Sequence, residues 1–203
     1  MIFLNKPKYV KVDNKLYKIN TDFRIAIKCN NIAQNKKIGD YERSMAIIYL
    51  LFGEDGLNCS KMVKLQELGL KYITLSNDKG KLFKKKPSDD FEMDFVKCEG
   101  LIRSSFKFDY NYDPYELEYL HWYDFYNDLC NLSTNEFGTC CILNRIMGIL
   151  NQDVSKIKDD KDRQNLIDLQ KLLKEKYCVI NKKELTKEQE ESAEAFYKAI
   201  GII

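Results

Sequence analysis

The chain has 203 residues, of which 44% are hydrophobic, 9 are Gly and 3 are Pro, and its formal net charge is +2. This composition can fill one sizeable apolar core, and it argues against extended disorder and against a turn-rich all-β fold. No apolar run approaches the roughly 20 residues that cross a bilayer, and residues 1–10 lack the pattern of a secretory signal, so a cytosolic protein is expected.

The chain opens with a predicted β-hairpin and a first helix. Residues 9–19 alternate apolar and polar side chains on both sides of Asp13-Asn14, a pattern typical of a hairpin. Thr21 or Asp22 then provides the N-cap of a helix over residues 23–35.

Two further helices are expected before residue 76. The first covers residues 41–52, and Gly53 and Gly56 are expected to end it. The second covers residues 60–75, although Gly69 weakens this helical pattern.

Residues 76–88 are polar, rich in Lys and end near a proline, which predicts a loop or linker. Its cluster Lys84–Lys86 could hold phosphate, but no Gly-rich cradle or interleaved aromatic accompanies it, so a solvated loop is favoured. We expect one helical domain over residues 1–203. Two subdomains, 1–75 and 88–180, joined by this loop are the alternative.

The second half begins with a predicted helix over residues 89–108, capped by Ser88 and with acidic residues in its first turn. An aromatic helix over residues 115–130 follows, which holds the only Trp and the only His of the chain. Asp113-Pro114 supplies its N-cap and first position. Its apolar face passes through Trp122, which we expect to be buried.

Three more helices complete the predicted fold. A capping box beginning at Ser133 starts a short helix that ends near Gly148. A long charged helix covers residues 160–177 with a stripe of leucines, and a second capping pattern opens a C-terminal helix over residues 186–200. The sequence therefore predicts a mainly α fold, an irregular multi-helix bundle with a short N-terminal β-hairpin.

The charges are unevenly distributed along the chain. Residues 1–86 carry 18 Lys and Arg against 8 Asp and Glu, whereas residues 87–136 carry 3 against 12. A weak nucleic-acid binder could have such a first part, but the acidic block beside it would oppose binding. We expect copies of the chain to meet basic face to acidic face, which predicts a homo-oligomer.

One group of residues suggests a metal site. Glu118 and His121 form an E-x-x-H, but a di-iron bundle needs two such motifs and the chain has a single His. A single site of Glu118, His121 and Asp124 is conceivable, and a partly exposed His beside carboxylates is the favoured alternative. A Cys–His pair would also have to use His121, and the seven cysteines include no C-x-x-C, so reduced core thiols are expected.

Neither a G-x-S-x-G, a G-x-G-x-x-G nor a P-loop motif occurs in the chain. We therefore expect no enzyme: no catalytic residue, no metal ligand and no cofactor-binding residue.

Three segments carry a resemblance to a known family: Leu16–Arg24 (LYKINTDFR), Glu116–Leu129 (ELEYLHWYDFYNDL) and Arg145–Gln164 (RIMGILNQDVSKIKDDKDRQ). In order and spacing, over about residues 9–177, they resemble the bacteriophage gene-product-fifteen family, small proteins encoded in the tail modules of long-tailed phages. Tyr123 stands where the family often has a second Trp, and the segment beyond about residue 180 lies outside the family pattern.

The resemblance implies a non-enzymatic tail assembly chaperone in the host bacterial cytoplasm. Its expected partners are the tape measure protein and, second, the tail tube protein. A structural tail subunit retained in the virion and a helical nucleic-acid-binding regulator are the alternatives.

Overall fold

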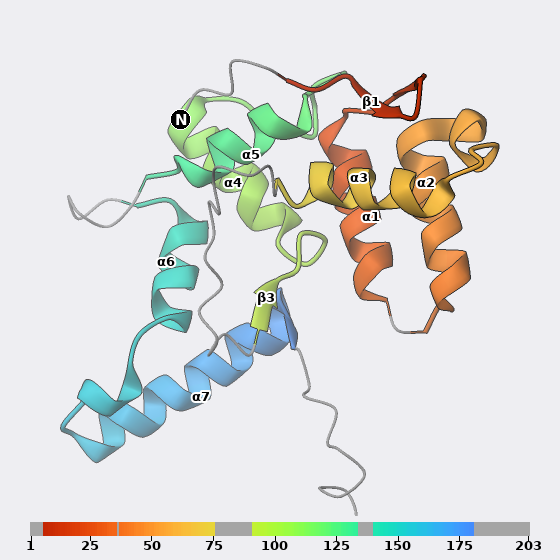
Figure 1. Cartoon of the computed structure of the whole chain (residues 1–203). Helices are drawn as coiled ribbons and strands as arrows, with labels where there is room; N and C mark the ends of the chain where they lie inside the picture. Colours follow the sequence, from red (N-terminus) through yellow and green to blue (C-terminus); the bar gives the residue numbers. More distant parts are fainter. Residues whose placement is uncertain (1–5, 36, 76–90, 134–139, 181–203) are drawn as a thin grey trace, which may run out of the picture.

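The computed structural model describes residues 6–35, 37–75, 91–133 and 140–180 (Figure 1). The elements are, in chain order, β1 (Tyr9–Val12), β2 (Lys15–Lys18), α1 (Phe23–Gln34), α2 (Asp40–Leu57), α3 (Met62–Ile73), β3 (Phe91–Met93), α4 (Glu99–Tyr110), α5 (Trp122–Cys130), α6 (Ile142–Leu150), the 3₁₀ turn η2 (Val154–Lys156), α7 (Asp160–Tyr177) and β4 (Cys178–Ile180). This confirms the mainly α fold with an N-terminal hairpin. The predicted loop 76–88 and helix 186–200 lie outside the described residues.

The hairpin and the first helix form as predicted. Val12 pairs with Lys15 in antiparallel register, and Asp13 in the two-residue turn has a positive φ of 52°. α1 then begins at Phe23 because the side chain of Asp22 accepts a hydrogen bond from the backbone N–H of Arg24, at 2.9 Å.

The second helix is interrupted at Gly53, as predicted. Gly53 has φ 66° and ψ −156°, a non-helical conformation that glycine adopts readily, and a further short helical segment, included in α2, continues to Leu57. Gly69 also has a packing role in α3. A Cβ there would lie 2.8 Å from Cδ1 of Leu51, so the glycine permits close packing of α3 on α2.

The helix predicted over residues 89–108 is wrong in its first part. Phe91–Met93 form β3, which pairs antiparallel with β4 so that Met93 lies opposite Cys178, and α4 begins only at Glu99. The pairing partner is distant in sequence, so the local pattern contains no sign of it. Three residues in or just before α4 are fully buried: Cys98, Ile102 and Phe106.

The aromatic helix begins at Trp122 and not at Tyr115 as predicted. Asp113 accepts a hydrogen bond from the N–H of Tyr115 at 3.0 Å, as a cap would, but only a turn follows. Residues 120–122 pair with residues 21–23 through two backbone hydrogen bonds, Phe23 N to Leu120 O at 3.0 Å and Trp122 N to Thr21 O at 2.8 Å. This pairing keeps the backbone extended and delays the helix.

The start of α6 also differs from the prediction, because Cys141 precedes the helix as its N-cap residue. The Oγ of Ser133 accepts a hydrogen bond from the N–H of Cys141 at 3.0 Å. This serine therefore binds the backbone just before α6 from eight residues earlier in the sequence. The buried Ser105 of α4 accepts another from the N–H of Leu143, at 3.1 Å. By contrast, α7 has the predicted bounds of Asp160 and Tyr177.

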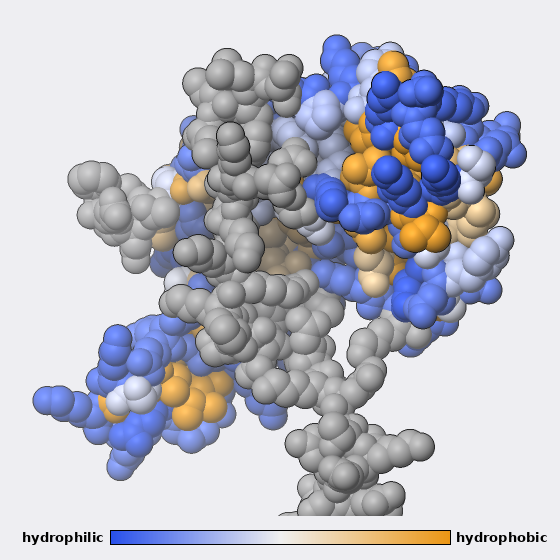
Figure 2. All heavy atoms as spheres, in the orientation of Figure 1, coloured by the Kyte–Doolittle hydropathy of each residue, from blue (hydrophilic) through white to orange (hydrophobic). Residues whose placement is uncertain are grey.

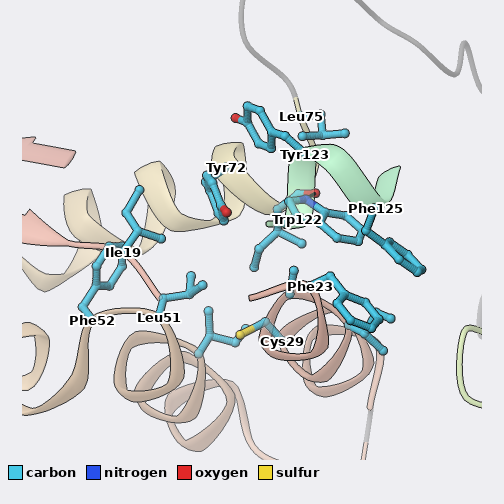
Figure 3. Packing of buried hydrophobic residues seen from close by; sticks show 14 of the residues in the cluster. Ile19, Phe23, Cys29, Leu51, Phe52, Tyr72, Leu75, Trp122, Tyr123 and Phe125 are labelled. Carbon is cyan, nitrogen blue, oxygen red and sulfur yellow. Dashed lines mark hydrogen bonds between the residues drawn. The ribbon is translucent and has the colours of Figure 1, made fainter. Parts of the chain in front are cut away.

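One aromatic core joins the two halves of the chain (Figure 3). The ring of Phe23 stacks on that of Phe125 with centroids 4.3 Å apart, and Phe125 stacks in turn on Phe106 at 5.5 Å. The indole N–H of Trp122 donates to the carbonyl of Ile73 at 3.1 Å. The division into subdomains 1–75 and 88–180 stays a prediction.

Replacing Trp122 by Ala should lower the free energy of unfolding by roughly 3–5 kcal/mol, because the indole is 3% exposed and its removal leaves a cavity. Trp122→Phe should cost less, since the smaller aromatic ring fills part of the cavity and the main further loss is the hydrogen bond to Ile73. Urea unfolding followed by circular dichroism measures both. Native tryptophan fluorescence at the wavelength of the free amino acid in water would contradict the burial.

Candidate functional site

His121 is a structural residue that caps a helix. It is 5% exposed and forms an antiparallel bridge with Asp22. Its Nδ1 accepts a hydrogen bond from the backbone N–H of Tyr123 at 3.0 Å, which makes His121 the N-cap of α5. The favoured prediction of a partly exposed His is therefore wrong, because the pairing with Asp22 draws the ring into the core.

The structure does not bring the three metal-site candidates together. Glu118 is exposed, and its backbone carbonyl accepts a hydrogen bond from Arg24 at 2.7 Å. Asp124 forms an ion pair with Lys6, also at 2.7 Å. Among the residues that the structure describes, no three His, Cys, Asp or Glu side chains are grouped as metal ligands would be. That His121 binds no metal stays a prediction.

Burial keeps three of the cysteine thiols protonated. Burial raises the pKa of the Cys29 thiol and of the Cys98 thiol to about 12. Burial also raises the pKa of Cys178, which begins β4. At neutral pH these three side chains are therefore neutral, and they pack as small apolar groups.

Part of the uneven charge along the sequence is compensated within one chain. Lys6, from the basic first part, pairs with Asp124 of the acidic block. Within that block, Arg103 and Lys107 pair with the buried carboxylate of Asp113, at 2.7 and 3.1 Å. These contacts leave fewer charges for the expected meeting of basic and acidic faces between copies.

An open groove with a volume of about 710 Å³ lies beside the kink of α2. Its lining comes from the end of β2, the turn into α1, the first turn of α1, the second half of α2 and residue 119. These residues are Lys18, Ile19, Asn20, Thr21, Ile25, Tyr49, Leu50, Leu51, Phe52, Gly53, Asp55 and Tyr119. We call this hollow the α2 groove.

The α2 groove has an apolar floor and aromatic edges. Ile19 and Leu51 are buried beneath it, while Tyr49 and Tyr119 are 53% and 55% exposed. The hydroxyl of Tyr119 is 2.6 Å from Oγ1 of Thr21, a hydrogen bond that fixes one edge. Gly53 shapes the wall through its kink. Such a surface can receive apolar side chains of a ligand between two rings.

The arm formed by α6 and α7 is a second exposed surface. Figure 1 shows α7 lying apart from α1, α2 and α3. None of the residues of α7 is buried, and Leu169 and Leu172 are 41% and 60% exposed. Figure 2 shows apolar atoms among polar ones on this lobe, at the lower left. The leucine stripe was predicted from the sequence, but its exposure was not.

The sequence matches the model of one known protein family. The family model described as bacteriophage Gp15 protein matches residues 5–175. The chain belongs to the bacteriophage Gp15 family. No curated protein and no solved structure matches the chain.

The family match covers the segments that carry the features described above. It includes His121, the α2 groove and α7 up to residue 175, whereas the segment after residue 180 lies outside it. This confirms the resemblance found in the sequence. None of the helices in the described parts of this Gp15-family protein combines the length and apolar composition of a membrane span.

The cap predicts how variants of His121 behave. Replacing His121 by Ala should lower the free energy of unfolding by about 1 kcal/mol for the lost cap, and by more for the lost packing of the ring. His121→Asn should cost less, because Asn supplies an acceptor for the N–H of Tyr123. Equal losses in both variants, measured by urea unfolding, would contradict a capping role.

The contribution of His121 to the free energy of unfolding decreases at low pH. Burial lowers the pKa of His121 below its ordinary value, against the opposing effect of Asp124. The stability that the neutral His121 contributes is fully present above its pKa in the unfolded chain, about 6.5. It is lost as the pH falls through the lower pKa that His121 has in the folded chain. An NMR titration of this single histidine should therefore give a midpoint below that of a His peptide.

Proposed function

We propose that this Gp15-family protein is a non-enzymatic tail assembly chaperone that binds the tape measure protein in the host bacterial cytoplasm. Membership of a bacteriophage family supports a role in the phage, and the residue-level resemblance supports the tail. The capping role of His121 and the neutral thiols of Cys29 and Cys98 support a non-enzymatic role. The observation that carries the proposal is the α2 groove.

The groove suits the apolar stripe of a helical client. Ile25 and Leu50 are partly exposed in it and offer apolar contact, while Tyr49 and Tyr119 can cover a client side chain and keep their hydroxyls in water. Binding of an amphipathic helix in an apolar groove is a common mode of peptide recognition. A tape measure protein with many such stripes aggregates unless they are covered, and the groove would cover them in turn.

The polar edge of the groove helps to choose the orientation of the client. Lys18 and Asp55 both line it, so each sign of charge is present beside the apolar floor. Charged residues that flank an apolar stripe can therefore find opposite charges at the edge. Such exposed pairs contribute roughly 0–1 kcal/mol each, so they direct binding while the apolar floor supplies most of the affinity. The tail tube protein is a second proposed partner.

Co-expression with the tape measure protein tests the proposal. The wild-type chain should raise the soluble fraction of the tape measure several-fold, and Tyr49→Lys should abolish most of this gain. The substitution places a strongly hydrated charge at the edge of the groove, at a side chain exposed enough to leave the fold intact. Soluble tape measure is quantified after centrifugation.

Tyr41→Lys is the matched control, because Tyr41 lies on the same helix, is 69% exposed and does not line the groove. It should solubilise as well as wild type. Equal loss in the two variants, or none in either, would refute the groove as the client site. Stoichiometric recovery of the chain from purified virions would favour the rival role of a structural tail subunit.

A further inference from the structure

α7 is held along one side and at its C-terminal end, where the N–H of Asp94 donates to the carbonyl of Tyr177 at 3.1 Å. Nε2 of Gln170 donates to the carbonyls of Ile149 and Gln152, at 2.8 Å each, and Nε of Arg163 donates to the carbonyl of Ile157 at 3.2 Å. These bonds define the inner side of the helix, against the end of α6 and the turn that follows it. The side away from them has no helix packed on it within the described residues.

One flank beside this inner side is apolar in the middle and charged at both ends. With 3.6 residues per turn, the exposed Leu169 and Leu172 lie next to each other on it, and the half-buried Leu166 lies at its border with the inner side. Asp162 and Lys176 lie seven residues before and after Leu169, on the same flank and each about 10.5 Å from it along the helix axis. We call these five residues the α7 flank.

We propose that a second copy of this chain covers the α7 flank, with the two α7 helices antiparallel around a two-fold axis near Leu169. In this register Leu169 of each copy contacts Leu169 of the other, and Leu166 lies opposite Leu172. Asp162 of each copy lies opposite Lys176 of the other. The contact is isologous and closed, so it forms a dimer and no chain of subunits.

The order of charges favours a second copy in this orientation. The first turn of α7 contains Asp160 and Asp162, and its last turn contains Lys174 and Lys176. Antiparallel copies place each acidic end beside a basic end and oppose their helix dipoles favourably. Parallel copies would place Asp162 beside Asp162. Neither Asp162 nor Lys176 forms an ion pair within the described residues, and Nζ of Lys176 lies 5.1 Å from the centroid of the neighbouring Tyr177 ring.

The size of the surface determines the strength of the contact. α7 has 18 residues and is about 27 Å long, and one flank of it buries less than the roughly 800 Å² per partner of a standard interface. The dimer should therefore dissociate at concentrations on the order of micromolar. The inference is independent of whether the α2 groove binds a tape measure protein.

Sedimentation velocity of the full chain over a range of concentrations tests the dimer. Leu169→Glu should raise the dissociation constant roughly 100-fold, because each change enters the symmetric contact twice and each costs about tenfold. Ile167→Glu is the matched control, since Ile167 is 39% exposed on the same helix but lies about 160° around it from Leu169. Circular dichroism confirms that both variants fold.

A charge exchange tests the orientation. Asp162→Lys and Lys176→Asp should each weaken the dimer, because like charges then meet at both ends. An equimolar mixture of the two variants should form heterodimers, because every contact then joins a Lys to an Asp. A strict monomer at every concentration, a dimer insensitive to Leu169→Glu, or no recovery in the mixture would overturn the inference. So would association that survives all these changes and disappears in high salt.

Discussion

The fold depends on the antiparallel pairing of residues 21–23 with residues 120–122. Two backbone hydrogen bonds join these segments, and the antiparallel bridge between Asp22 and His121 lies in the middle. These same two residues are the N-caps of α1 and α5. Two helices from distant parts of the chain thus begin at one point, which places Phe23 on Phe125 and builds the aromatic core around that stack.

Local sequence patterns predicted the elements whose signals are local. The hairpin turn at Asp13, the cap at Asp22 and the bounds of α7 all follow from neighbouring residues. The patterns failed where a distant segment determines the backbone. Phe91 became part of a strand because β4 pairs with it, and residues 115–121 stayed out of the helix because residues 21–23 hold their end extended.

The candidate sites show the same division. The E-x-x-H formed by Glu118 and His121 suggests a metal site, whereas the role of His121 as an N-cap depends on a helix that begins after it and not before it. The α2 groove could not be predicted, because residues near 20, 50 and 119 come together only when residues 21–23 pair with residues 120–122. Its one signal in the sequence is Gly53, at which the second helix is interrupted. The leucines of α7 were visible, but a stripe in the sequence does not reveal whether a partner helix covers it.

The two proposed binding surfaces, the α2 groove and the α7 flank, differ in how much buried core lies beneath them. The α2 groove stands on a core of fully buried side chains such as Leu51, whereas α7 has no buried residue and should therefore open locally at a lower free energy. Pairing through α7 would order this weakest part and join two grooves in one dimer. If the proposed client presents many apolar stripes, the second groove would bind at a raised effective concentration. Each groove could then bind weakly, and the proposed chaperone would release a long client one contact at a time.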